Sequence, residues 1–129
     1  MDAEFSIDVD PSRDLVRLRL AGFFSHADIA RFEAARASAH RALTCGPNRH
    51  VTVTDVRGMK IQSQDMVTAF RELLAAPEYR SRRLAFITGP SLTRTQLQRA
   101  IGSRDARCFS DPAEALAYVL SDTSDALAA

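Results

Sequence analysis

A short segment in the middle of the chain carries the residue types best suited to binding chemistry. Its members are Asp55, Arg57, Met59, Lys60 and Ser63. A carboxylate, two cations and a hydroxyl could together hold an anion or a polar partner. An apolar side chain among charges is typical of surfaces that bind another protein. This segment is therefore the candidate site for a ligand or a protein partner.

Each of these residues also has a purely structural interpretation. Asp55 precedes Arg57 and Gly58, so it could cap a turn or pair with a nearby arginine. Ser63 precedes an amphipathic stretch, where its hydroxyl could accept the free amide protons of a helix start. Arg57 and Lys60 could equally be solvated loop residues. The residue pattern alone leaves the binding and the structural roles open.

Other side chains able to do chemistry are isolated from one another in the sequence. No pair among His26, His40 and His50 has metal-ligand spacing, and none is tied in sequence to a serine or cysteine nucleophile. Cys45 and Cys108 are too few and too far apart for a disulfide framework. We therefore expect no catalytic residues, no metal and no cofactor.

Two further segments resemble binding motifs only superficially. Residues 89–93 precede a helix, but they lack the glycine spacing and the lysine of a phosphate-binding loop. Arg80, Arg82 and Arg83 are interpreted as a charged loop leading into a strand. A nucleic-acid surface would need a larger positive charge than the formal +1 of this chain, together with stacking aromatic residues. Nucleic-acid binding is not expected.

Length and composition indicate one ordinary globular domain. The 129 residues are 46% hydrophobic and 26% charged, which suffices for a single core. The chain shows neither a secretory signal nor an apolar run long enough for a membrane span. Abundant alanine and arginine, with a single lysine, favour a GC-rich bacterial source, and the low cysteine content favours a cytoplasmic setting. We expect one domain over residues 1–122 and a frayed tail over 123–129.

The elements that position the candidate site alternate along the chain. Alternating apolar and polar residues predict an antiparallel hairpin over 5–20. A β-branched run predicts a third strand over 51–56, which would place Asp55 near its carboxyl end, where open α/β sheets bind ligands. Apolar residues predict an inner strand over 84–87 and a short last strand over 106–109.

Capping residues predict four helices between and after these strands. The expected order is therefore an α/β fold with a five-stranded mixed sheet, in which an N-terminal β-hairpin precedes βαβαβα crossovers and four helices pack on the sheet. The expected N-caps are Ser25, Ser63, Thr93 and Asp111, and the expected stops are residues 46–48, Pro77 and Gly102.

This pattern resembles the STAS family, the bacterial anti-sigma-factor antagonist domains, and looks closest to stand-alone relatives that are also compared with the CRAL-TRIO lipid-transfer fold. The resemblance covers nearly the whole chain. It rests on the hairpin Phe5–Leu20 ending at Gly22, the strand Val51–Val56, the run Leu84–Ile87 and the helix start Phe109–Leu116. It implies a STAS-like fold and a binding module, often part of a signalling complex, without catalysis of its own.

Antagonists of that family carry a phosphorylatable serine in an Asp-Ser-Ser-Gly or Asp-Ser-Gly turn before the helix that follows strand three. Only Ser63 could stand in for it here, and the glycine that should follow is absent. The departure argues against a phosphorylation switch. The resemblance still places the partner contacts on this loop and helix start, so Met59 and Ile61 should be at least partly exposed.

The sequence therefore predicts a non-enzymatic binding or regulatory module that acts through an unidentified protein partner in bacterial signalling, and it leaves a homodimer open. The alternative is a carrier of a small molecule, lipid or acyl ligand, with an apolar pocket between the helices and the sheet.

Overall fold

The structure, a computed structural model, describes residues 2–89, 92–101 and 106–121. Its five-stranded sheet has the order β1-β2-β3-β4-β5, so the strands lie in the order of the chain. β1 and β2 form an antiparallel hairpin, and β3, β4 and β5 run parallel to β2. The predicted mixed sheet is confirmed. The strands are β1 (Glu4–Asp10), β2 (Leu15–Gly22), β3 (Val51–Met59), β4 (Arg83–Ile87) and β5 (Arg107–Phe109).

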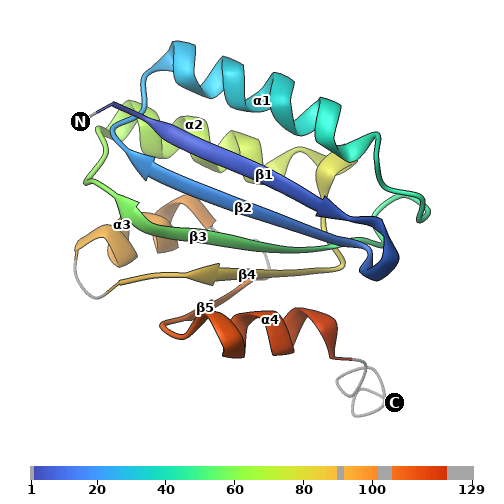
Figure 1. The fold of residues 1–129 in the computed structure, drawn as a ribbon. Coiled ribbons are helices and arrows are strands. Elements are labelled where there is room, and N and C mark those ends of the chain that lie inside the picture. The colour runs from blue at the N-terminus through green and yellow to red at the C-terminus, as the bar shows by residue number, and fades with distance from the viewer. Residues whose placement is uncertain (1, 90–91, 102–105, 122–129) are drawn as a thin grey trace.

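Helices cover both faces of this sheet (Figure 1). One face packs against the first three helices and the other against the last, which lies over β3, β4 and β5. The helices within the described residues are α1 (His26–His40), α2 (Gln64–Ala75), α3 (Leu92–Ile101) and α4 (Pro112–Leu120).

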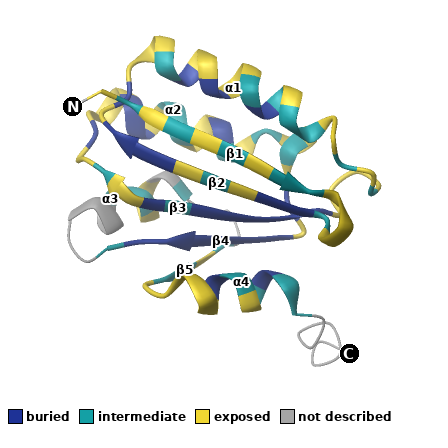
Figure 2. Ribbon diagram, viewed as in Figure 1, coloured by how far each residue is buried: buried dark blue, intermediate teal, exposed yellow. Residues whose placement is uncertain are grey.

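The sheet separates two apolar cores because successive side chains of a strand point to opposite faces. Val51 and Val53 of β3 pack with Ala115 and Val119 of α4. Val56 packs instead with the cluster that includes residues of α1 and α2. Figure 2 shows the buried residues concentrated along β3 and β4, the strands that are covered on both faces.

The N-caps of three helices lie where the sequence predicts them. Ser25 and Asp28 form the expected capping box of α1. Ser63 accepts a bond from Met66 N, and Asp111 accepts one from Ala113 N. The prediction for Thr93 is wrong, because α3 begins at Leu92 and already contains it.

The predicted end of the first helix is also wrong. α1 ends at His40, and the chain then continues in tighter turns in which Ala42 N bonds to Ala39 O and Leu43 N bonds to His40 O. The helix therefore ends before the glycine and proline at 46–47. α2 ends at Ala75, two residues before Pro77, as predicted. Gly102 and the tail at 123–129 lie outside the described residues.

The third strand is longer than the sequence predicts. It continues beyond Val56 to Met59 because β2 also continues to Gly22, which pairs with Met59. Two residues of β3 lie opposite one residue of β2 between the pairs Arg19–Asp55 and Ala21–Gly58. This β-bulge changes which side chains of β3 face the helices.

Arg83 does not belong to a solvated loop, contrary to the sequence-based interpretation. It is the first residue of β4, and it is buried. Its guanidinium donates to the carbonyl oxygens of Tyr118 and Ser121 at the end of α4. Hydrogen bonds from its guanidinium allow a long charged side chain to lie in a core.

Candidate functional site

Asp55 and Arg57 form a closed ion pair within β3. The Asp55 carboxylate accepts bonds from Arg57 Nη2 at 2.7 Å, Arg57 Nε at 3.1 Å and the Arg57 backbone N–H at 3.0 Å. Bonds from the Arg57 side chain lower the pKa of Asp55, while partial burial opposes that shift. A partner that binds here would therefore contact two opposite charges that already neutralise each other.

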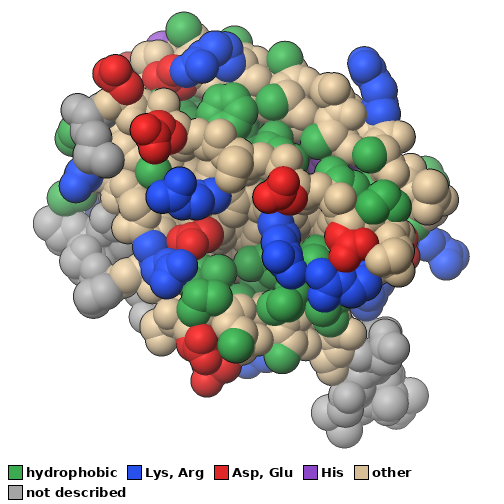
Figure 3. Space-filling view, in the orientation of Figure 1, with side chains coloured by type: hydrophobic (Ala, Val, Ile, Leu, Met, Phe, Trp, Pro, Cys, Tyr) green, Lys and Arg blue, Asp and Glu red, His purple; other side chains and the backbone are tan. Residues whose placement is uncertain are grey.

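This ion pair belongs to a charged area on the face of the sheet that α4 covers only in part. Asp55 lies two residues after Val53, so it faces the same side of β3. It pairs in register with Arg19 of β2, and Asp8 of β1 pairs with Arg17. Figure 3 shows acidic and basic side chains lying next to one another across this face. Neither positive nor negative charge dominates on this face.

The β-bulge separates the other predicted site residues from this ion pair. Met59 is partly buried and packs against the core beneath α1 and α2. Lys60 and Ser63 are exposed, and Ile61 is half exposed. The exposure expected of Met59 and Ile61 is therefore present. The predicted site divides into a pair on the sheet face and a connection over residues 59–63.

Ser63 acts as a helix cap, since its Oγ accepts the amide of Met66 at 3.3 Å. We expect Ser63→Ala to lower the free energy of unfolding by about 1 kcal/mol, whereas Ser63→Asp should change it little because aspartate also caps well. Urea unfolding of both variants measures the two values. A loss of partner binding by the aspartate variant at unchanged stability would instead indicate a regulatory role for this hydroxyl.

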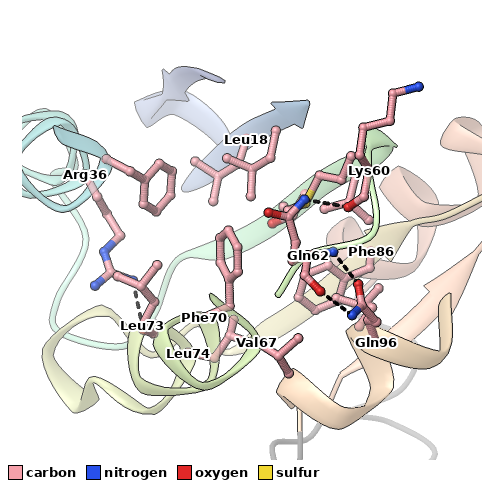
Figure 4. Close-up of a pocket in the computed structure, with 16 residues that line it drawn as sticks. Leu18, Arg36, Lys60, Gln62, Val67, Phe70, Leu73, Leu74, Phe86 and Gln96 are labelled. Atoms are coloured by element: carbon pink, nitrogen blue, oxygen red, sulfur yellow. Dashed lines mark hydrogen bonds between the residues drawn. The ribbon is translucent and has the colours of Figure 1, made fainter. Parts of the chain in front are cut away.

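A cavity of about 90 Å³ lies between the sheet and the helices α1, α2 and α3. Its walls are mainly apolar side chains from β2, β3, β4 and all three helices (Figure 4). The sequence-based alternative expected an apolar pocket between the helices and the sheet, but its lining residues are spread from Leu18 to Leu97 and could not be picked out from the sequence. Its principal apolar residues are Leu18, Leu20, Phe32, Val56, Phe70 and Phe86.

A hydrogen-bonded glutamine pair lines one end of the cavity (Figure 4). The Gln62 side chain accepts from Phe24 N and donates to Gly22 O, both at 2.9 Å, and it also donates to Lys60 O. The side-chain amide of Gln96 in α3 bonds to both backbone groups of Gln62. It accepts from the Gln62 N–H at 2.6 Å and donates to the Gln62 carbonyl at 2.7 Å. These bonds fix the connection between β3 and α2.

Arg36 lies at the opposite end of the cavity (Figure 4). The residue is only 8% exposed. Its Nη1 donates to Leu73 O at 2.9 Å, and its guanidinium carbon lies 4.1 Å from the centre of the Tyr79 ring. Burial lowers the pKa of this guanidinium. Helical spacing from the buried Ile29 and Phe32 was the sequence signal that could have located it.

His40 and His50 are not isolated in space, contrary to the expectation from their spacing. The His40 ring lies 4.7 Å from that of His50 and 4.9 Å from that of Tyr79. His50 Nε2 lies 3.2 Å from Ser81 Oγ, which lies 2.6 Å from Thr52 Oγ1. His50 and Ser81 are buried, so this network joins the start of β3 to the segment before β4.

Burial and the neighbouring His50 and Arg36 lower the pKa of His40 to about 4. The ring is therefore neutral at pH 7. Across residues 2–89, 92–101 and 106–121, no cluster of three or more histidine, cysteine or acidic side chains could hold a metal ion. No helix in these ranges has the length and hydropathy needed to cross a membrane.

Comparison with known proteins identifies the fold. No family model matches the chain, and no curated protein matches it. An uncharacterized protein of the DUF3478 family from Shewanella loihica PV-4, with a SpoIIAA-like fold, superposes with a TM-score of 0.69 at 17% identity, over 92% of this chain and 96% of the other.

The anti-sigma factor antagonist SpoIIAA in its unphosphorylated form superposes with a TM-score of 0.52, also at 17% identity, over 97% of this chain and 98% of the other. Both structures are similar over nearly their whole length. The chain therefore has the SpoIIAA-like fold that the sequence resemblance implies.

Proposed function

We propose that this chain is a non-catalytic binding module that works through a protein partner. The partner surface comprises the predicted residues Met59, Lys60 and Ser63 together with Phe23 and Ile61. The fold shared with an anti-sigma factor antagonist supports a regulatory role of this kind. A bacterial cytoplasmic setting, with residues 1–122 acting as one domain, is part of the same proposal.

The observation that carries the proposal is the placement of two exposed apolar side chains. Phe23 and Ile61 are each 50% exposed, and among the described residues they are the large hydrophobic side chains most open to solvent. They lie on neighbouring segments, because Lys60 N bonds to Gly22 O at 3.2 Å and Gln62 bonds to Phe24 N. Exposed apolar residues on neighbouring segments, together with charged residues such as Lys60, are typical of protein-binding surfaces.

This surface is also well ordered by the bonds beneath it. The Gln62 side chain ties residues 60–62 to the end of β2, and the Ser63 cap fixes the start of α2. A surface that is already held in one conformation loses little entropy when a partner binds. The same bonds hold Ile61 outward, since Gln62 next to it is turned inward.

A photo-crosslinking amino acid placed at position 61 or 23 tests the proposal in cells. We expect a crosslinked product of defined mass from both positions and none from Ala117, an exposed residue of α4. With the purified partner, Ile61→Ser should weaken binding about tenfold or more at an unchanged melting temperature. Ala117→Ser is the matched control and should bind normally.

Equal crosslinking from position 117, or unchanged affinity after Ile61→Ser combined with Phe23→Ser, would contradict the proposal. A crosslinked product with twice the mass of the chain would identify the partner as a second copy. Sedimentation of the purified protein then checks whether Ile61→Ser dissociates that dimer.

A further inference from the structure

The apolar cavity beneath α1 and α2 has a cation in its wall that the protein's own groups only partly satisfy. Arg36 lines this cavity of about 90 Å³ and also an adjoining one of about 50 Å³. Both are bounded by Leu18, Leu73 and Leu74. A guanidinium in such surroundings is unusual, because a buried charge is normally paired.

The bonds of Arg36 account for only part of its donor capacity. Nη1 donates to Leu73 O, and one face of the guanidinium stacks over Tyr79. Nε is buried and has no acceptor among the described residues. Glu33 and Glu78 lie close enough to raise the pKa of Arg36, but no carboxylate of the described residues lies within ion-pair distance of it.

We propose that the cavity binds a small organic acid whose carboxylate pairs with Arg36 and whose hydrocarbon part lies among Leu18, Phe32 and Phe70. A carboxylate oxygen supplies the acceptor that Nε lacks and the negative charge that the guanidinium needs. This ligand site goes beyond the proposed partner surface and does not depend on it.

The size of the cavity limits the acid. A cavity of roughly 150 Å³ lined by similar side chains binds benzene. The cavity of about 90 Å³ is smaller than that, and the space of about 50 Å³ shares five of its lining residues, so the acid should have a body no larger than benzene. A long-chain lipid does not fit without separating the helices from the sheet.

Access is expected at the end of the cavity near Lys60. This residue is exposed and lines the cavity through its aliphatic stem, while Figure 4 shows its amine directed outward. A cation at an opening favours the approach of an anion. The groove on the other side of Arg36, between α1 and α2, is lined by Glu33, Asp65, Glu72 and Glu78, which disfavour an anion there.

Titration of the purified protein with hexanoate and with 1-hexanol, followed by backbone amide NMR, tests the proposal. The two probes share the hydrocarbon chain and differ in charge. We expect saturable shifts at residues lining the cavity, with hexanoate binding at least tenfold more tightly than 1-hexanol. Arg36→Met should weaken hexanoate at least tenfold and change 1-hexanol less than twofold. Arg41→Met, at an exposed arginine after α1, is the control and should change neither.

Equal affinities for the two probes, no saturable binding, or unchanged hexanoate affinity in Arg36→Met would each overturn the proposal. Thermal unfolding checks that the variants fold. If Arg36→Met is unfolded, Val67→Phe provides the second test, because it narrows the cavity without touching the cation. It should abolish hexanoate binding, and retained binding would place the acid elsewhere.

Discussion

Replacing Gln62 by methionine should lower the free energy of unfolding by about 3 kcal/mol. The side chain is 7% exposed and is the hydrogen-bond partner of Phe24 N, Gly22 O and Lys60 O. Methionine has a similar length but has neither the carbonyl oxygen that accepts nor the NH2 group that donates these bonds. Each buried polar group left without a partner costs about 1–3 kcal/mol. Urea unfolding at neutral pH measures the loss.

Gln64→Met is the matched control for this prediction. Gln64 is the first residue of α2 and is exposed, so its replacement should change the free energy of unfolding by less than about 0.5 kcal/mol. If Gln62→Met proved as mild as Gln64→Met, the three backbone groups would have to be satisfied by water or by a rearranged connection. The bonding described for residues 60–62 would then be incorrect.

Lowering the pH from about 6.5 to about 4 should destabilise the protein through His40. Its pKa is near 6.5 in the unfolded chain and about 4 in the folded protein, because burial, His50 and Arg36 all disfavour the charged ring. The unfolded state therefore binds more protons between these values, and stability falls as the pH falls. Since the ring is only half buried, solvent screening leaves a loss of about 1–2 kcal/mol.

Urea unfolding across this pH range, for the natural protein and for His40→Gln, measures the contribution. The variant should lose less stability between pH 6.5 and 4. His26→Gln, at an exposed histidine of the same helix, should keep the slope of the natural protein. Asp10, Asp28 and Asp55 have lowered pKa values, so their stabilisation is lost mainly below 3.8, outside this window. If the free energy of unfolding changed with pH in the same way for all three proteins, the role of His40 would be refuted.

Structural features that depend only on residues close in sequence, such as helix caps and strands, could be predicted from the sequence. The caps at Ser25, Ser63 and Asp111 depend on side chains that bond within three residues of their own position. The hairpin and the inner strand follow from alternation and from a continuous apolar run. These local signals sufficed to predict the element order, and hence the sheet.

Features set by distant pairing were not accessible. The length of β3 depends on how far β2 continues beside it, and the bulge after Asp55 depends on their relative register. Burial of Arg36 depends on Tyr79 and on Leu73 O, which lie far along the chain. The candidate loop was found by residue type, but its division into two surfaces follows from the bulge alone.

The order of the strands in the sheet has a consequence for how the chain acquires its structure during synthesis. Each strand pairs with the strand made immediately before it, so no strand has to insert between two that are already in place. Contacts between segments close in sequence form fastest, and the N-terminal part leaves the ribosome first. The β1–β2 hairpin can therefore act as a template to which β3, β4 and β5 are added in turn. A nascent chain halted after α2 would expose the free backbone edge of β3, which would be open to mispairing with a neighbouring chain.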